Sequence, residues 1–217
     1  MATFASSSHT RKRGHASVQI EHAGKVIQVD PVGQANYAQA KAADLILITD
    51  IHGDHLDPAA IAKIRKPGAP IVAPAAVAAQ IADATVMANG ERKTVAGVSI
   101  EAVAMYNLTR GPSAGQLYHT KGRGNGYILT LGGKRVYLSG DTECTPEMRA
   151  LTNIDVAFLC MNLPYTMPVG EAAACAKAFK PRIVYPYHYR GQNLDEFKAA
   201  LKGEPIDVRL LNWYPGK

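Results

Sequence analysis

The sequence contains little cysteine and no long apolar run. Its three cysteines, Cys144, Cys160 and Cys175, are too few and too scattered for a disulfide framework or a cysteine-based zinc site. No apolar run approaches the ~20 residues that a membrane-spanning helix requires. Residues 1–13 are polar and basic and lack the apolar segment of a signal peptide. We therefore expect a protein of the cytoplasm, which is a reducing compartment. If a signal peptide has been removed, we expect the periplasm instead.

A dominant charge of one sign is also absent. The 217 residues include 24 Lys and Arg against 18 Asp and Glu, which gives a formal net charge of +6. The basic residues are dispersed, apart from the run Arg11-Lys12-Arg13, so we expect no nucleic-acid partner. The modest positive charge instead favours a small anionic substrate. The length fits one domain over residues 1–217, with residues 1–13 as a flexible tail and the oligomeric state left open.

A polar loop rich in metal-binding side chains follows the apolar run 45–48. The run is short and β-branched, so it predicts a buried strand whose carboxyl end opens into the loop. In an extended segment, side chains two positions apart share one side, and Gly53 lets the backbone turn. A loop that only caps the next helix needs one acceptor. This loop supplies four candidate ligands within six positions, namely Asp50, His52, Asp54 and His55. Carboxylates and imidazoles without a thiolate favour zinc, manganese or iron.

The rest of the chain alternates between β and α patterns. Hairpins are predicted over 15–30 and over 126–138, where turn residues separate alternating apolar positions. Apolar spacing and capping residues predict helices over 59–65, 74–82, 169–179 and 194–201, and strands over 71–73, 86–105, 155–160, 182–186 and 206–211. Residues 37–43 form a short helix or a linker. This mixed order predicts an α/β sandwich with partly antiparallel sheets.

Four polar side chains stand one to three residues beyond the ends of four different predicted strands: Asp50, Asn107, Asp141 and His188. Each has an ordinary structural explanation, such as a turn aspartate or a half-buried histidine. If the strands run in the same direction where they meet, one rim of the sheets collects all four. Together with the loop at 49–55 they predict a metal site at that rim.

The segment 106–126 is the longest stretch without clear periodicity. It contains His119, Lys121 and Arg123 among several glycines, and long loops of this kind inside a compact domain are usually functional or disordered. We interpret it as a substrate loop, with a mobile surface excursion as the alternative. Tyr165 and Tyr189 flank predicted rim loops and would line a pocket, unless they are ordinary half-buried tyrosines.

Three stretches, taken in order, resemble the motifs of the metallo-β-lactamase-fold hydrolases. They are Thr49-Asp-Ile-His-Gly-Asp-His55, Gly140-Asp141-Thr142 and Tyr185-Pro-Tyr-His188-Tyr. Gly14-His15 and the hairpin that ends in Asp30-Pro31 look like the start of that fold, in its branch of small stand-alone, lactonase-like members. The resemblance implies a four-layer αβ/βα sandwich with a two-metal site at one edge of the two sheets.

The resemblance also implies ligand roles. His52 would bind the first ion, Asp54 and His55 the second, Asp141 would bridge both, and His188 would complete the second site. Two positions depart from the family pattern, since Asp50 and Asn107 stand where histidines are usual. The first site would then use Asp50, His52 and Asp141 with either the amide oxygen of Asn107 or His119 from the long loop. Oxygen ligands in place of imidazole shift the preference toward manganese or iron over zinc.

These residues predict a hydrolase that uses a metal-activated water on a small, anionic ester, lactone or phosphodiester. Two divalent ions and a hydroxide balance the three carboxylates Asp50, Asp54 and Asp141. We expect catalytic roles for Asp54, Asp141 and His119, with His119 and Lys121 able to steady an oxyanion or protonate the leaving group. Asn107, Lys121, Tyr165 and Tyr189 are the expected substrate contacts. The alternatives are a di-iron oxidoreductase on the same fold and a degenerate metal-binding protein without turnover.

Overall fold

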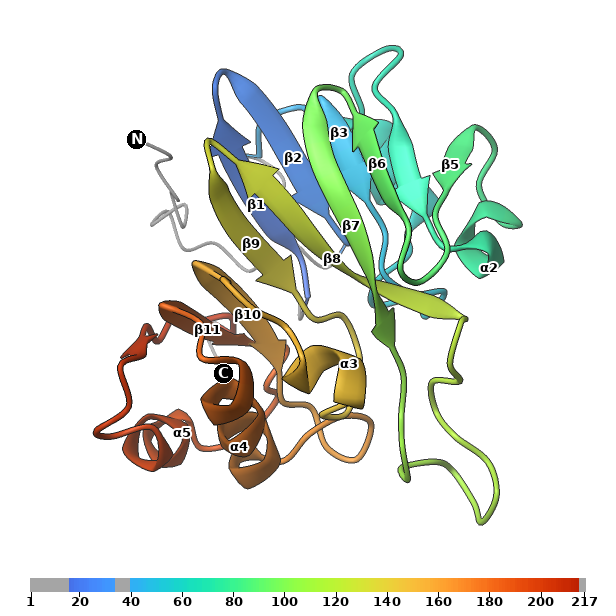
Figure 1. The fold of residues 1–217 in the computed structure, drawn as a ribbon. Helices are drawn as coiled ribbons and strands as arrows, with labels where there is room; N and C mark the ends of the chain where they lie inside the picture. The colour runs from blue at the N-terminus through green and yellow to red at the C-terminus, as the bar shows by residue number, and fades with distance from the viewer. Residues whose placement is uncertain (1–15, 34–39, 215–217) are drawn as a thin grey trace.

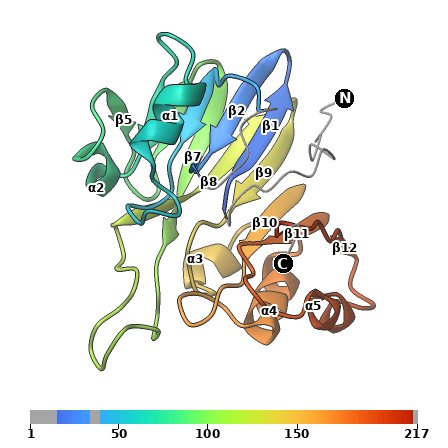
Figure 2. The ribbon, with the colours of Figure 1, turned by 180° about the vertical axis from the view of Figure 1, so that it is seen from behind.

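Two β-sheets pack face to face, with helices on their outer sides (Figures 1 and 2). The computed structural model describes residues 16–33 and 40–214. One sheet has the order β1 (Val18–His22), β2 (Lys25–Val29), β3 (Leu45–Leu47), β4 (Ile71–Ala73) and β5 (Ala84–Val86). The other has the order β12 (Asp207–Val208), β11 (Ile183–Tyr187), β10 (Val156–Cys160), β9 (Lys134–Leu138), β8 (Gly124–Leu131), β7 (Val98–Met105) and β6 (Arg92–Val95). The predicted α/β sandwich is therefore confirmed.

The helices cover the outside of these sheets. Figure 2 shows α1 (Pro58–Ile64) and α2 (Ala75–Ala78) beside the first sheet, and Figure 1 shows α3 (Pro146–Arg149), α4 (Val169–Phe179) and α5 (Leu194–Ala200) beside β10 and β11. Strand β3 shows why the layers form. Leu45 and Leu47 point into the core between the sheets, whereas Ile46 and Ile48 pack with the apolar residues of α1. Both faces of this strand are buried, so its sequence is continuously apolar.

Strand directions bring the predicted ligand positions to one edge. Strands β7 and β9 both pair antiparallel with β8, and β10 and β11 continue parallel to β9. The carboxyl ends of β7, β9 and β11 therefore share one edge with the start of β8. The first sheet is joined to this edge because Asn125 donates its backbone N–H to the carbonyl of Thr49 at 2.9 Å, and the Tyr127 hydroxyl donates to the carbonyl of Ile48 at 2.8 Å.

Two glycines allow the sheets to approach closely at this edge. A Cβ on Gly124 would lie 2.9 Å from the Thr49 carbonyl oxygen and would overlap the side chain of Met105. Gly140 has a φ of +60°, and a Cβ there would lie 2.4 Å from the Met105 sulfur and 3.2 Å from the Thr49 Cβ. Only glycine fits both the left-handed backbone and the contact. Asp141 follows Gly140 directly, so this turn sets where its carboxylate lies.

Several elements differ from the sequence predictions. Helix α2 ends at Ala78 rather than residue 82, and β12 covers Asp207–Val208 rather than 206–211. The predicted tail at 1–13 and His15 lie outside the described residues, as do residues 37–39 of the predicted helix or linker at 37–43. Within the described part of the chain, no helix combines the length and apolarity needed to cross a membrane.

The cysteines also differ from expectation, because Cys144 and Cys175 form a disulfide while Cys160 stays a buried free thiol. The sequence alone argued against a disulfide framework. A single bridge forms because the fold places the segment after β9 against α4. Because the two cysteines are 31 positions apart, the bridge restricts a long loop of the unfolded chain.

We expect reduction of this disulfide to lower the free energy of unfolding by about 3 to 4 kcal/mol, from the loss of that restriction. Chemical denaturation with and without a reductant measures the difference. The double variant Cys144→Ala/Cys175→Ala is the control and should not respond to the reductant. Equal unfolding midpoints of the unmodified chain under both conditions would contradict the prediction.

Candidate metal centre

The loop after β3 and the residue after β11 form one group of candidate ligands. The ligand atoms of Asp54, His55 and His188 lie within 4.8 Å of one another, and we call these residues the second ligand group. The backbone N–H of His55 donates to the carbonyl of His52 at 2.9 Å, which closes the turn that brings His55 alongside Asp54. His188 has a φ of +49°, an unfavourable value for a histidine that is typical of functional sites.

A first ligand group lies beside it and consists of Asp50, His52 and His119, whose ligand atoms also lie within 4.8 Å of one another. Asp50 and His119 are buried, whereas the His52 side chain is 43% exposed. His119 comes from the loop between β7 and β8. Of the two alternatives for completing the first site, the structure brings in the His119 imidazole and not the Asn107 amide.

Asp141, three residues after the end of β9, lies between the two groups. Its Oδ2 is 3.4 Å from His55 Nε2 and 3.5 Å from His119 Nε2, and its Oδ1 is 3.5 Å from His188 Nε2. Both carboxylate oxygens therefore face imidazole nitrogens, and the side chain contacts both ligand groups. This is the position that a bridging ligand needs.

The residues fit divalent ions. His55 Nε2, His119 Nε2 and Asp141 Oδ1 are buried and make no hydrogen bond. Buried polar atoms almost always have a bonding partner. Three such atoms without one in the same place therefore fit a shared partner such as an ion. Two atoms bound to one ion at ~2.1 Å with tetrahedral geometry lie about 3.4 Å apart. The separations of 3.4 and 3.5 Å around Asp141 agree with that value.

A buried carboxylate behind His55, which sequence reasoning did not assign to the site, orients its ring. Asp30 Oδ2 lies 2.8 Å from His55 Nδ1 and accepts the Thr49 hydroxyl at 2.6 Å, while Oδ1 accepts the Thr49 backbone N–H at 2.7 Å. With Nδ1 donating to Asp30, the neutral ring of His55 has its lone pair on Nε2, the atom that faces Asp141. In the sequence, the feature that could have pointed to this role of Asp30 is its place at the Asp30-Pro31 end of the first hairpin.

An amide behind His119 does the same for the first ligand group. Asn107 Oδ1 accepts from the His119 backbone N–H at 2.8 Å and from Nδ1 at 2.7 Å. Its Nδ2 donates to the Tyr165 carbonyl at 2.8 Å and to the buried carboxylate of Glu143 at 3.2 Å, which determines the orientation of the amide. Asn107 is only 1% exposed. It was an expected substrate contact, but in the structure it lies behind the side chain of His119.

We expect Asn107→Ala to weaken ion binding at the first ligand group by roughly 10- to 100-fold, because His119 loses the partner that orients its ring. Calorimetric titration with Mn²⁺ measures this, and binding at the second ligand group should not change. Asn193→Ala is the control, since Asn193 Oδ1 also accepts two N–H groups, here both from the backbone at the start of α5. Equal Mn²⁺ affinities for Asn107→Ala and the unmodified chain would contradict the assigned role.

Burial and charge hold the imidazoles in different states in the protein alone. Burial lowers the pKa of His119 to about 4 despite the nearby carboxylates, so its ring is neutral near pH 7, the form that binds metal. Burial also opposes a charge on His55, but Asp141 and Asp30 outweigh it and raise the pKa of His55 well above its usual value. A proton thus neutralises the carboxylates in the place where a divalent ion fits.

The chain matches known proteins over most of its length. The model of a β-lactamase superfamily domain matches residues 10–188. The chain belongs to this superfamily. It is similar to a relative named metal-dependent hydrolase from Pyrococcus abyssi, with 38% identity over 94% of this chain and 95% of the relative.

Solved structures of this superfamily's fold are also similar. One, described as a metal-dependent hydrolase of Parabacteroides distasonis, has 46% identity and a TM-score of 0.85 over 90% of this chain and 89% of that one. Another is CmlA, a diiron β-hydroxylase of Streptomyces venezuelae, with 17% identity and a TM-score of 0.66 over 93% of this chain and 54% of that one. At that identity the second likeness concerns the fold alone.

The remaining predicted substrate contacts lie outside the two ligand groups. Lys121 is exposed, forms an ion pair with Glu147 and lies over the Tyr106 ring. The Tyr189 hydroxyl is 3.3 Å from the carbonyl of Leu211, to which it donates. Tyr165 is 40% exposed and packs edge-on against Tyr118, the residue before His119. Of these three side chains, Tyr165 is the one that contacts a neighbour of a ligand residue in this superfamily member.

Sequence reasoning also missed the role of Arg123. It was one of several basic residues of the long loop, and no spacing in the sequence relates it to the loop after β3. In the structure its guanidinium forms an ion pair with Asp50, with Nη2 at 2.9 Å from Oδ2. A cation therefore already contacts the first ligand group.

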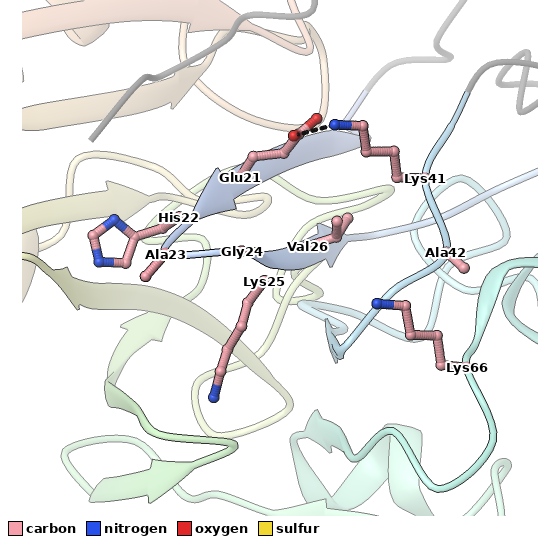
Figure 3. A pocket seen from close by; sticks show the side chains of 9 residues that line it. All are labelled: Glu21, His22, Ala23, Gly24, Lys25, Val26, Lys41, Ala42 and Lys66. Atoms are coloured by element: carbon pink, nitrogen blue, oxygen red, sulfur yellow. Dashed lines mark hydrogen bonds and ion pairs between the residues drawn. The ribbon is translucent and has the colours of Figure 1, made fainter. Parts of the chain in front are cut away.

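A separate hollow of about 400 Å³ lies at the β1–β2 turn, at the other end of β2 from Asp30 (Figure 3). Its lysines already have partners. Lys41 pairs with Glu21 at 2.6 Å, Lys66 pairs with Asp44 at 2.7 Å, and Lys25 donates to a backbone carbonyl. The hollow therefore does not offer an anion a set of free cations, and it gives no second candidate site.

Proposed function

We propose that this chain is a metal-dependent hydrolase that cleaves a small ester, lactone or phosphodiester. The position of Asp141 carries the proposal. Its two oxygens face imidazoles of both ligand groups, where the nitrogens of His55 and His119 are buried and make no hydrogen bond. The relatives named metal-dependent hydrolases support the same activity.

Divalent ions in such a centre supply a water molecule acidic enough to attack an ester or phosphodiester near neutral pH. The protein's own residues define where that attack takes place. Asp141 holds the two ligand groups together, and its burial keeps bulk water away from the carboxylate. Asp54 has a side chain that is 33% exposed, so it is the carboxylate of the centre that can exchange a proton with a substrate or solvent.

His119 fits a ligand role better than the proton-donor role expected from the sequence. Its Nδ1 donates to Asn107 at 2.7 Å, which leaves the lone pair on Nε2, between Asp50 and Asp141. A neutral imidazole in this state has no proton on the nitrogen that faces the centre. We therefore propose Asp54, rather than His119, as the group that handles the proton of the reaction.

The rim of the centre suggests part of the substrate. Tyr165 is 40% exposed, its ring lies 4.9 Å from that of Tyr118, and its carbonyl is hydrogen-bonded to Asn107. The basic side chains Lys121 and Arg123 are both already paired with carboxylates. We propose that the non-reacting part of the substrate is apolar or aromatic and stacks on this tyrosine pair.

The test is a panel of nitrophenyl esters, lactones and a nitrophenyl phosphodiester, assayed with chain loaded with Mn²⁺ or Zn²⁺. We expect turnover of at least one class, lost on treatment with a chelator and restored by the ion. Elemental analysis of untagged protein grown without added metal gives the identity and number of the ions. Turnover that survives complete ion removal would refute a metal-dependent mechanism.

A di-iron oxidoreductase is the second candidate, favoured by a ligand set with three carboxylates, which suit harder ions. Iron in the purified protein together with redox-dependent absorption would support it, and turnover of the ester panel without iron would not. A degenerate protein without turnover is less well supported, because each ligand group is complete with three side chains.

A further inference from the structure

Arg123 lies where it can influence which ion site fills. It directly precedes β8, whose first residue pairs with Met105 at the end of β7, so it stands at the edge that carries the ligands. Its Nε donates to Asp50 Oδ1 at 3.1 Å and its Nη2 to Oδ2 at 2.9 Å, while Nη1 donates to the Tyr118 carbonyl at 2.8 Å. The planar guanidinium therefore covers both oxygens of Asp50 and is held in place by three hydrogen bonds.

The contacts of Arg123 fall on the first ligand group. Besides its pair with Asp50, its Nη2 lies 3.5 Å from His52 Nε2. The carboxylate of the second group, Asp54, has only histidine partners in its ion pairs among the described residues, and the same holds for Asp141. An ion entering the first group must share Asp50 with a fixed guanidinium, whereas among the described residues neither Asp54 nor Asp141 has a lysine or arginine partner.

The charges of the centre agree with unequal sites. Asp50, Asp54 and Asp141 carry three negative charges, and Arg123 reduces the sum to two. A single divalent ion then neutralises the centre, so a second ion enters a region that is no longer negative. Repulsion between like charges a few ångströms apart is strong where side chains are buried, and the Asp50 side chain is fully buried.

We propose that Arg123 makes the first ligand group the weaker ion site, so that ions bind in order, first at Asp54, His55 and His188 and then at Asp50, His52 and His119. The second step requires Asp50 to share its oxygens with Arg123 or to release it. The proposal rests on the proposed metal-dependent function, and it assigns a role in metal loading to a residue outside the ligand set.

Calorimetric titration of ion-free protein with Mn²⁺ tests the order, with elemental analysis after gel filtration as a second reading. We expect the unmodified chain to bind one ion tightly and another at least about 10-fold more weakly, because of the nearby positive charge. Arg123→Gln should tighten the weaker step by about 10-fold or more and raise the ions retained on gel filtration from one to two. Neither reading depends on activity.

Arg92→Gln is the matched control, because it removes the same charge from an arginine that pairs with Glu101 at 3.2 Å on the exposed side of β6. It should bind Mn²⁺ as the unmodified chain does. If Arg123→Gln does not fold, Arg123→Lys decides the matter. A lysine ammonium covers one oxygen of Asp50 at a time, so the weaker step should still tighten several-fold.

Two results would overturn the proposal. One is equal affinity for both ions in the unmodified chain, and the other is a weaker step that neither Arg123 variant tightens. Both leave the proposed hydrolase intact, because it is judged by ion-dependent turnover. A chain that binds no ion and turns over nothing would instead refute the metal-dependent function, and this proposal with it.

Discussion

Asp141→Asn is expected to abolish ion-dependent turnover and to leave at most one bound ion. Asparagine keeps the size of the side chain but removes its charge, and one of its two polar atoms becomes an N–H₂ group that cannot bind a cation. Replacing an outer partner of a ligand typically costs roughly 10- to 100-fold in affinity or activity. Asp141 contacts both ligand groups directly, so its loss should cost more than that at each of them.

Turnover of the best substrate of the panel and elemental analysis of the same sample measure this effect together. Asp207→Asn is the control, since Asp207 pairs with Arg209 at 2.7 Å on the surface and its side chain is 52% exposed. It should retain full turnover and ion content. Asp141→Asn protein that keeps undiminished activity would show that Asp141 does not bridge the centre.

Asp30→Asn is expected to have the second largest effect, on stability as well as on ion binding. The carboxylate is fully buried and accepts three hydrogen bonds from Thr49 and His55. An amide in its place replaces one acceptor oxygen with an N–H₂ donor, which leaves at least one buried N–H or O–H of Thr49 and His55 without an acceptor. We expect a loss of about 3 kcal/mol or more in the free energy of unfolding.

The same substitution should disturb the second ligand group. A buried carboxylate holds a histidine in one tautomer, and an asparagine in that place can hold it in the other. His55 would then carry its proton on Nε2, the atom that faces Asp141, and its affinity for an ion should fall roughly 10- to 100-fold. Mn²⁺ titration of the folded variant measures the change in ion affinity, and denaturant unfolding measures the change in the free energy of unfolding.

Asp44→Asn is the matched control for Asp30→Asn. Asp44 likewise accepts a backbone N–H, from Val26 at 2.9 Å, and lies just before β3, but its side chain is 28% exposed and pairs with Lys66. Its substitution should cost no more than about 1 kcal/mol and leave ion binding unchanged. Similar losses for both variants would mean that Asp30 is an ordinary structural aspartate.

Local patterns in the sequence were sufficient for most of the secondary structure. Helix α4 begins and ends where predicted, at Val169 and Phe179, and the hairpin turns at 23–24 and 132–133 lie between the predicted strands. These features depend on apolar periodicity and turn residues, which act over a few positions. The short helix α2 and the two-residue strand β12 were overestimated, because tertiary packing decides where a weak local preference ends.

The sequence by itself determined the strand that leads into the loop 49–55 and the ligand types in that loop, because their spacing is local. Only the tertiary structure decided what completes the centre. His119, Arg123 and Asp30 reach it from segments far away in the sequence. Their side chains are held there by Asn107, Asp50 and Thr49. Contacts of this kind depend on how the two sheets meet at Gly124 and Gly140, which no local pattern encodes. For the same reason, the pairing of Cys144 with Cys175 follows from the fold and not from their spacing.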